Sequence, residues 1–302
     1  MNAPTMPGSP AAPPRLPGAG GPGAAVLRWL CDPRPAAAPA ELDPAALGAV
    51  LQAAIDAKLV CLLAGRLLHD RAGAGLSRAM RSFFGQIVRA TTLHHRLHHT
   101  EAVRIVQMLA HRDVSIAVLN GLAYDTGLYP PGGLRQFTDI DLLVGGADLG
   151  TALEVLAELG FREQGRGPHT RRRVTGDALT PAVSVDITAH LGHTSDPAEV
   201  RAALARTETA EGPNAGGKLP VLARADALRH TLARLAARPR WSTLADAARL
   251  ALAAPQPSDE VVAAVPEPVR AGWAVLHSHL PDLFPGPPPV AGGGRAEGEV
   301  AR

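Results

Sequence analysis

The segment that most constrains the fold of this chain is residues 139–144, with the sequence DIDLLV. Side chains alternate along a β-strand, so Asp139 and Asp141 are expected on one face, with their Cα atoms about 6.6 Å apart. The apolar residues at 140, 142 and 144 then share the opposite face. A strand with one apolar face needs neighbouring strands and a covering layer, and a chain of 302 residues that is 46% hydrophobic is long enough to supply both.

The sequence around this strand predicts a small mixed sheet over residues 113–192. Short apolar, β-branched runs at 114–119 and 183–189 are further strand candidates, and so is the segment 170–174. Helices are expected at 121–128 and at 148–159, where a glycine ends the second one. We therefore expect an α+β fold whose mixed-sheet core lies between helical regions.

The flanking regions have helical periodicity and the two ends do not. Residues 24–112 carry apolar side chains three and four positions apart, and the same pattern returns in 193–284, with helices at 197–206, 224–238, 242–253 and 259–279. Residues 1–23 and 285–302 are rich in Pro, Gly and Ala and contain few bulky apolar side chains. We expect both tails to be disordered.

Composition excludes several classes of protein. No stretch approaches 18 consecutive apolar residues, so no membrane span is expected, and the N-terminus does not resemble a secretory signal. The 30 basic and 28 acidic residues give a net charge of +2, which does not indicate nucleic-acid binding. Two cysteines cannot form a disulfide framework, so a cytoplasmic location is expected.

The residues with site chemistry cluster around the DIDLLV strand. Two carboxylates on one strand face repel each other unless a cation lies between them, and Mg²⁺ prefers such oxygen ligands. Asp186, on the strand candidate 183–189, is expected to add a third carboxylate. Gly121 opens a helix directly after a strand, where free backbone N–H groups can bind phosphate. Together these features predict a divalent metal opposite a phosphate cradle, the arrangement that phosphoryl transfer requires.

Each of these residues also has a structural interpretation. Asp139 and Asp141 can cap neighbouring backbone groups, and Asp186 can be a solvated strand residue. Arg135 can clamp a phosphate or pair with Asp139. The basic run 171–173 is expected to be solvated.

The helix predicted around residue 95 carries four histidines in two pairs spaced four apart, a spacing that can hold a transition metal. These are His94, His95, His98 and His99. No nearby cysteine or acidic cluster completes a coordination shell. We therefore expect a hydrated helix face there.

The segment from 121 to 144 resembles the bacterial uncharacterised nucleotidyltransferase family, of the polymerase-beta-type nucleotidyltransferase superfamily. The similarity covers about residues 25–280 and extends beyond the strand itself. Its matching positions are Gly121, Leu128, Tyr129, Arg135, the strand 139–144, Gly160, Phe161, His169, Leu219, Pro220, His230, Trp241, Leu244 and Asp246. The chain departs from the family pattern at Asn120, where the family has a lysine, and at Thr188, where it usually has a histidine.

The resemblance implies a Mg²⁺-dependent nucleotidyltransferase that uses an NTP as donor and an unknown acceptor. By this interpretation Asp139, Asp141 and Asp186 are the catalytic metal ligands, and Asn120, Gly121 and Arg135 contact the nucleotide. Two other functions remain open. The missing lysine at Asn120 favours a catalytically degenerate module that binds a nucleotide or a protein, and the abundance of helix allows an interaction protein in which the sheet is only a scaffold.

Overall fold

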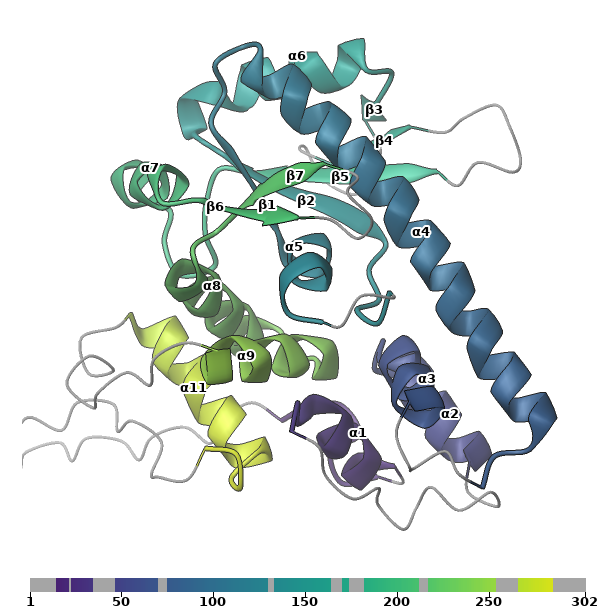
Figure 1. Ribbon diagram of the computed structural model, residues 1–302. Coiled ribbons are helices and arrows are strands. Elements are labelled where there is room, and N and C mark those ends of the chain that lie inside the picture. Colours follow the sequence, from purple (N-terminus) through teal and green to yellow (C-terminus); the bar gives the residue numbers. More distant parts are fainter. Residues whose placement is uncertain are drawn as a thin grey trace, which may run out of the picture.

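The computed structural model describes residues 15–21, 23–34, 47–69, 75–129, 133–163, 170–173, 182–211, 217–253 and 266–284. Residues 1–14 of the expected N-terminal tail, all of the expected C-terminal tail (285–302) and the site candidate His169 lie outside these residues. The predicted fold class is confirmed: a mixed sheet lies between N-terminal and C-terminal helices (Figure 1).

A mixed sheet of seven strands forms the centre of the molecule, in the order β3-β4-β5-β2-β1-β7-β6. The pairs β1–β2, β3–β4, β4–β5 and β6–β7 are antiparallel, whereas β2–β5 and β1–β7 are parallel. The strands are β1 (Ile116–Leu119), β2 (Asp139–Val144), β3 (Arg162–Glu163), β4 (Thr170–Arg173), β5 (Val183–Thr188), β6 (Glu208–Glu211) and β7 (Lys218–Val221).

The side-chain pattern of the central strands explains their positions. All of β1 is buried, and β5 alternates between buried and partly buried residues, as expected for a strand with one covered face. In β2 the two aspartates are partly buried while the apolar residues are fully buried. The pairing register places Asp141 opposite Leu119 of β1 on one side and opposite Asp186 of β5 on the other.

The sheet extends beyond the region in which the sequence places it. Strands β6 and β7 lie in the C-terminal helical region, in the gap between the helices expected at 197–206 and 224–238, where no strand is expected; β7 pairs directly with β1. Their pattern is weak because β6 is largely exposed and polar, and because Pro220 lies inside β7, where proline normally disfavours a strand. Tertiary pairing with β1 overrides that local preference.

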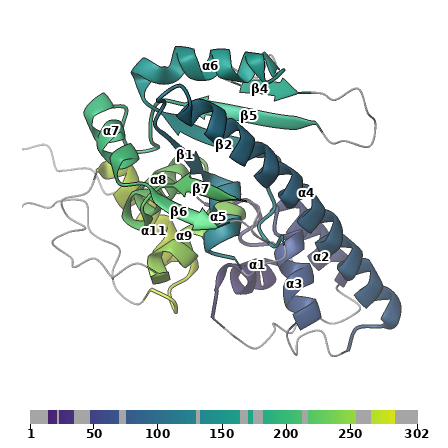
Figure 2. The same cartoon turned by 45° about the horizontal axis from the view of Figure 1, so that its top comes forward.

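Helices lie on both sides of the sheet. In the view of Figure 1, α6 (Leu149–Glu158) is above it and α5 (Asn120–Gly127) and α8 (Arg224–Ala237) are below it. The long helix α4 (Arg78–Ala110) runs diagonally across the molecule, as the turned view of Figure 2 also shows, and its 33 residues span about 50 Å. It begins at Ser77, whose hydroxyl accepts a hydrogen bond from the Met80 amide.

None of the described helices combines the length and the apolar character that a membrane crossing requires.

The remaining described α-helices are α1 (Ala24–Cys31), α2 (Leu47–Asp56), α3 (Val60–His69), α7 (Pro197–Ala205), α9 (Trp241–Ala253) and α11 (Glu267–His279).

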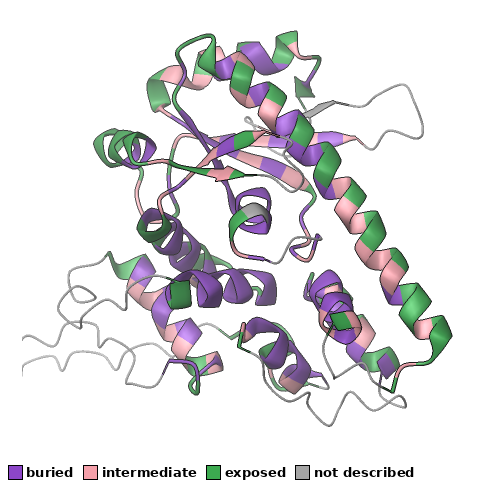
Figure 3. Ribbon diagram, viewed as in Figure 1, coloured by how far each residue is buried: buried purple, intermediate pink, exposed green. Residues whose placement is uncertain are grey.

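The two helical regions pack against each other, so they are not independent flanks. Helix α1 lies against α9, and the Cys31 thiol donates to the Trp241 carbonyl oxygen at 3.4 Å. The Trp241 indole N–H donates to the Pro17 carbonyl oxygen at 2.7 Å, and Leu16 is buried. Residues 15–21 therefore do not follow the disorder expected over 1–23, because this bond holds Pro17 against α9 and Leu16 is buried in the core. Figure 3 shows that both α1 and α9 consist mostly of buried residues.

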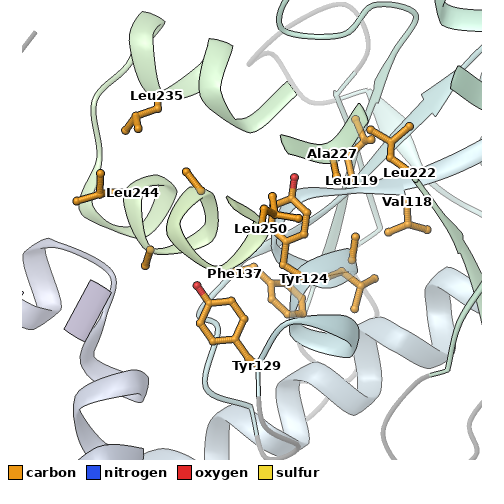
Figure 4. Close-up of a cluster of buried hydrophobic side chains, with 14 of the residues drawn as sticks. Val118, Leu119, Tyr124, Tyr129, Phe137, Leu222, Ala227, Leu235, Leu244 and Leu250 are labelled. Atoms are coloured by element: carbon orange, nitrogen blue, oxygen red, sulfur yellow. The ribbon is translucent and has the colours of Figure 1, made fainter. Parts of the chain in front are cut away.

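Two tyrosines lie in the apolar cluster between α5 and α9 that Figure 4 shows. Each hydroxyl has a buried partner: Tyr124 contacts the Thr231 hydroxyl at 2.6 Å, and Tyr129 donates to Asp246 Oδ1 at 2.7 Å. A buried hydroxyl without such a partner would cost free energy. The Tyr124 bond therefore favours the observed packing of α5 on α8, and the Tyr129 bond favours the packing of the segment after α5 on α9.

Candidate active site

Three carboxylates converge on one face of the sheet. Asp139, Asp141 and Asp186 each offer one oxygen atom, and these atoms all lie within 4.8 Å of one another. Adjacent strands produce this geometry, because Asp141 and Asp186 are direct partners across β2 and β5, and Asp139 lies two residues before Asp141 on the same face. The predicted convergence is confirmed. Among the described residues, no other group of three or more His, Cys, Asp or Glu gathers in this way.

The electrostatics of this triad favour a bound cation. Burial, with the negative charge of Asp139 next in size, raises the pKa of Asp141 from 3.8 to about 6. Asp186 Oδ1 is buried and has no hydrogen-bond partner among the described groups. A divalent cation would relieve both conditions, since it offsets the repulsion and ligates the unpartnered oxygen. Oxygen-only ligands of this kind fit Mg²⁺.

Asn120 connects the start of α5 to the triad. Its backbone has a φ of 55°, the left-handed region that asparagine tolerates better than most residues. Its side-chain amide donates a 2.7 Å hydrogen bond to Asp141 Oδ2. That bond opposes the upward shift in the pKa of Asp141. The expected contact between Asn120 and a nucleotide stays a prediction, because in the structure its amide contacts a carboxylate.

Gly121 lies where the sequence places it, in the first turn of a helix that directly follows a strand. A Cβ atom at this position would come within 2.4 Å of Phe137 Cβ. Glycine is therefore required for the close packing of α5 on the segment that leads into Asp139. A role in phosphate binding through its amide stays a prediction.

Arg135 has a different partner from either one that the sequence suggests. Its guanidinium is buried and donates to both carboxylate oxygens of Asp246, at 2.7 and 2.6 Å. The expected alternative pairing with Asp139 is wrong, because α9 brings Asp246 closer. The proposed phosphate contact stays a prediction, but the guanidinium is already engaged in a bidentate ion pair.

The four histidines of α4 do not form a hydrated face, so that expectation is wrong. His95, His98 and His99 are buried, because α4 packs this face against the segment before β2. The His95 ring stacks on Phe137 at 4.1 Å, and its Nδ1 lies 2.7 Å from Asp125 Oδ2. Burial lowers the pKa values of His98 and His99, so burial favours their neutral forms.

Sequence reasoning missed a contribution from α8. His230 and Arg234 are one helical turn apart and face the triad: His230 Nε2 lies 3.2 Å from Asn120 Oδ1. The positive charge of Arg234 acts to lower the pKa of Asp141. The spacing of four on the predicted helix 224–238 is a signal that both side chains share a face. Only the sheet geometry shows that this face meets the carboxylates.

Solved structures with similar folds include two nucleotidyltransferase-related proteins. An antigenic nucleotidyltransferase-like protein from Paracoccidioides brasiliensis is 16% identical with a TM-score of 0.46, and the match covers 62% of this chain and 90% of that one. ANT(2")-Ia in complex with adenylyl-2"-tobramycin is 18% identical with a TM-score of 0.35, covering 49% and 84%. The solution structure of ANT(2'')-Ia is 16% identical with a TM-score of 0.39, covering 64% and 95%.

No curated protein matches the chain by sequence. A family model described as "Uncharacterised nucleotidyltransferase" matches residues 43–263, well over half of the chain. The match includes every residue of the carboxylate triad as well as α5 and α8.

Proposed function

The chain belongs to the uncharacterised nucleotidyltransferase family, and on that premise we propose that it transfers a nucleotidyl group from an NTP to an acceptor. The observation that carries this proposal is the convergence of three carboxylates, each with an oxygen within 4.8 Å of the others, beside a buried oxygen of Asp186 that has no partner among the described residues. Acids that only stabilise a fold are normally paired, and Asp186 Oδ1 has no partner in the described part of the chain. The expected cytoplasmic location stays a prediction.

In this proposal Asp139, Asp141 and Asp186 hold Mg²⁺. When bound, Mg²⁺ neutralises charge that develops on the phosphate oxygens, which is worth several kcal/mol in the transition state. The acceptor oxygen attacks the α-phosphorus, the bond to the β-phosphate breaks, and pyrophosphate leaves. Asp186 Oδ1, which has no hydrogen-bond partner among the described residues, would either ligate the metal or take the proton of the attacking hydroxyl.

The positive side of the site comes from two elements that meet the triad. The first turn of α5, at Gly121, presents backbone N–H groups at the end of β1. Arg234 adds a positive side chain close enough to influence Asp141 electrostatically. We propose that these groups bind the β- and γ-phosphates, with Arg234 supplying charge that the neutral Asn120 does not.

The test compares wild type with Asp139→Asn by thermal unfolding, with Mg²⁺ alone, each NTP alone and both together. Ligands that bind only the folded state raise its melting temperature by mass action, so wild type should gain from the joint addition and the variant should not. Glu158→Gln is the control, because Glu158 is an exposed acid on α6 that is paired with Arg112 and is not part of the acidic cluster. It should respond like wild type.

Radiolabel from an α-phosphate-labelled NTP, followed into acceptor products in a cell extract, then tests transfer. Incorporation that Asp139→Asn abolishes supports the proposed enzyme. Binding of Mg²⁺ and NTP without incorporation or pyrophosphate release would instead favour the catalytically degenerate binding module. An equal thermal shift in wild type and Asp139→Asn, or none in either, would overturn the metal site.

A further inference from the structure

A chain of hydrogen bonds links the carboxylate triad to the loop after β5. The Gly192 N–H donates to His230 Nδ1 at 2.9 Å, His230 Nε2 meets Asn120 Oδ1 at 3.2 Å, and Asn120 Nδ2 donates to Asp141 Oδ2 at 2.7 Å. We call these three bonds the relay. They connect the loop after β5, α8, the β1–α5 junction and β2.

The direction of every donor in the relay follows from its first member. A backbone N–H can only donate, so His230 Nδ1 must accept and, in the neutral ring, Nε2 carries the proton. Nε2 therefore donates to Asn120, and the carbonyl of the Asn120 amide must face His230. The NH₂ group is then directed at Asp141, which, when ionised, can only accept.

The packing around the relay leaves little freedom for another arrangement. Asn120 and His230 are 8% and 5% exposed, so a lost bond would leave a buried polar atom without a partner. Gly192 approaches α8 so closely that a Cβ atom would lie 3.0 Å from the His230 carbonyl oxygen. Asn120 also keeps a left-handed backbone with a φ of 55°. Such conformations persist where the surrounding structure requires them.

We infer that His230 is a positioning residue for the metal ligand Asp141 and acts through Asn120. In the relay, Oδ2 of Asp141 accepts from a neutral donor, which fixes the rotation of the carboxylate and leaves Oδ1 outside the relay as the atom that would ligate a cation. Groups that orient a ligand in this way commonly change metal affinity when they are altered. This inference rests on the proposed function, since it requires that the triad bind a divalent cation.

Two substitutions at one position separate the bonds of His230. In His230→Gln the amide nitrogen can stand near the site of Nε2 and donate to Asn120. In His230→Asn the shorter side chain keeps an acceptor for Gly192 and loses the donor to Asn120. Thr231→Val is the matched control, because it removes a buried hydrogen bond one residue along α8, between Thr231 and Tyr124, without touching the relay.

The first measurement is the affinity of the full chain for Mn²⁺ alone, by calorimetry. His230→Asn should lower the affinity for Mn²⁺ by about tenfold, and His230→Gln should lower it by less. Thr231→Val should bind Mn²⁺ with the affinity of wild type. If His230→Asn binds Mn²⁺ as tightly as Thr231→Val, His230 has only a packing role and the inference is overturned. If wild type itself binds no Mn²⁺, the metal site of the proposed function is overturned, and the inference about His230 is overturned with it.

The second measurement does not depend on metal. The chain has three asparagines, Asn2, Asn120 and Asn214, so selective ¹⁵N labelling and an Asn120→Ala spectrum identify the side-chain signal of Asn120. Hydrogen exchange of the Asn120 side-chain NH₂ group should be about fivefold faster in His230→Asn, because the loss of one hydrogen bond of about 1 kcal/mol corresponds to that factor. In Thr231→Val the exchange rate should stay unchanged. Unchanged exchange in His230→Asn would show that the relay does not form, even if the metal site is real.

Discussion

The molecule holds its acidic side chains in two contrasting ways. Asp246, on α9, is buried and accepts two hydrogen bonds from Arg135 and one from Tyr129. The triad on β2 and β5 places three acids together, and one of its buried oxygens has no partner in the part of the chain that the structure describes. Both regions are well packed, so the difference lies in charge balance. A paired acid stabilises the fold, and an unbalanced acidic cluster is available to bind a cation.

The largest expected effect falls on the balanced region. Asp246→Ala leaves the Arg135 guanidinium buried without its counter-ion and removes the acceptor of the Tyr129 hydroxyl. Breaking one side of a buried ion pair typically costs about 3–5 kcal/mol of stability. Urea unfolding of wild type and Asp246→Ala measures this loss of unfolding free energy. A loss below about 1 kcal/mol, the level of an exposed pair, would remove the contrast between the two regions.

The next effect falls on catalysis and leaves the fold intact. Asp141→Asn keeps the shape of the side chain and removes a ligand charge, so nucleotidyl transfer should fall at least about a hundredfold, or about 2.7 kcal/mol. The metal-free melting temperature should stay the same or rise, because repulsion within the triad decreases. A lower melting temperature with activity retained would place Asp141 among the structural acids.

A smaller effect tests whether Gly121 is required by packing. Gly121→Ala forces a Cβ atom to within 2.4 Å of Phe137, and overpacking of this kind costs about 1–3 kcal/mol. Transfer activity should fall as well, since Phe137 lies two residues before Asp139. Gly127→Ala is the control in the same helix, because nothing lies within 4 Å of the added atom. Equal unfolding curves for the two variants would contradict the packing argument.

The smallest effect is a difference in pH dependence. The pKa of Asp141 is raised from 3.8 to about 6, so the folded state binds this proton more tightly than the unfolded state. Its stabilising contribution is therefore complete below about pH 4 and is lost as the pH rises through about 6. In a chelator, Asp141→Asn should melt at a higher temperature than wild type at pH 7, and this advantage should shrink toward pH 4.

Comparing the two proteins at each pH is essential because other groups titrate with the opposite sign. Burial lowers the pKa of His230 from 6.5 to about 3 and that of His94 to about 4. Both histidines contribute stability above pH 6.5 that is lost as the pH falls toward those values. Both are present in wild type and in Asp141→Asn, so their contributions cancel, and the difference reports Asp141 together with its interaction with Asp139 and Asp186. A constant difference from pH 4 to pH 8 would contradict the assignment.

The sequence by itself determined the elements that have a strong local pattern. The strand 139–144 is found with the predicted bounds, and alternation alone placed Asp139 and Asp141 on one face. The helix after β1 and the strand that carries Asp186 are also where the apolar pattern predicted them. These features depend on neighbours a few residues away, and a sequence records such neighbours directly.

Only the tertiary structure decided which partners these elements meet. Arg135 and Asp246 are 111 residues apart in the sequence, and Asn120 and His230 are 110 residues apart. Nothing in the local sequence pattern around these residues indicates either pairing. Strands β6 and β7 exist because β1 offers an edge for β7 to pair with, and the α4 histidines are buried because Phe137 packs on them. Contacts of this kind depend on how helices and sheet close around one another, so they follow from the packed fold rather than from any single segment.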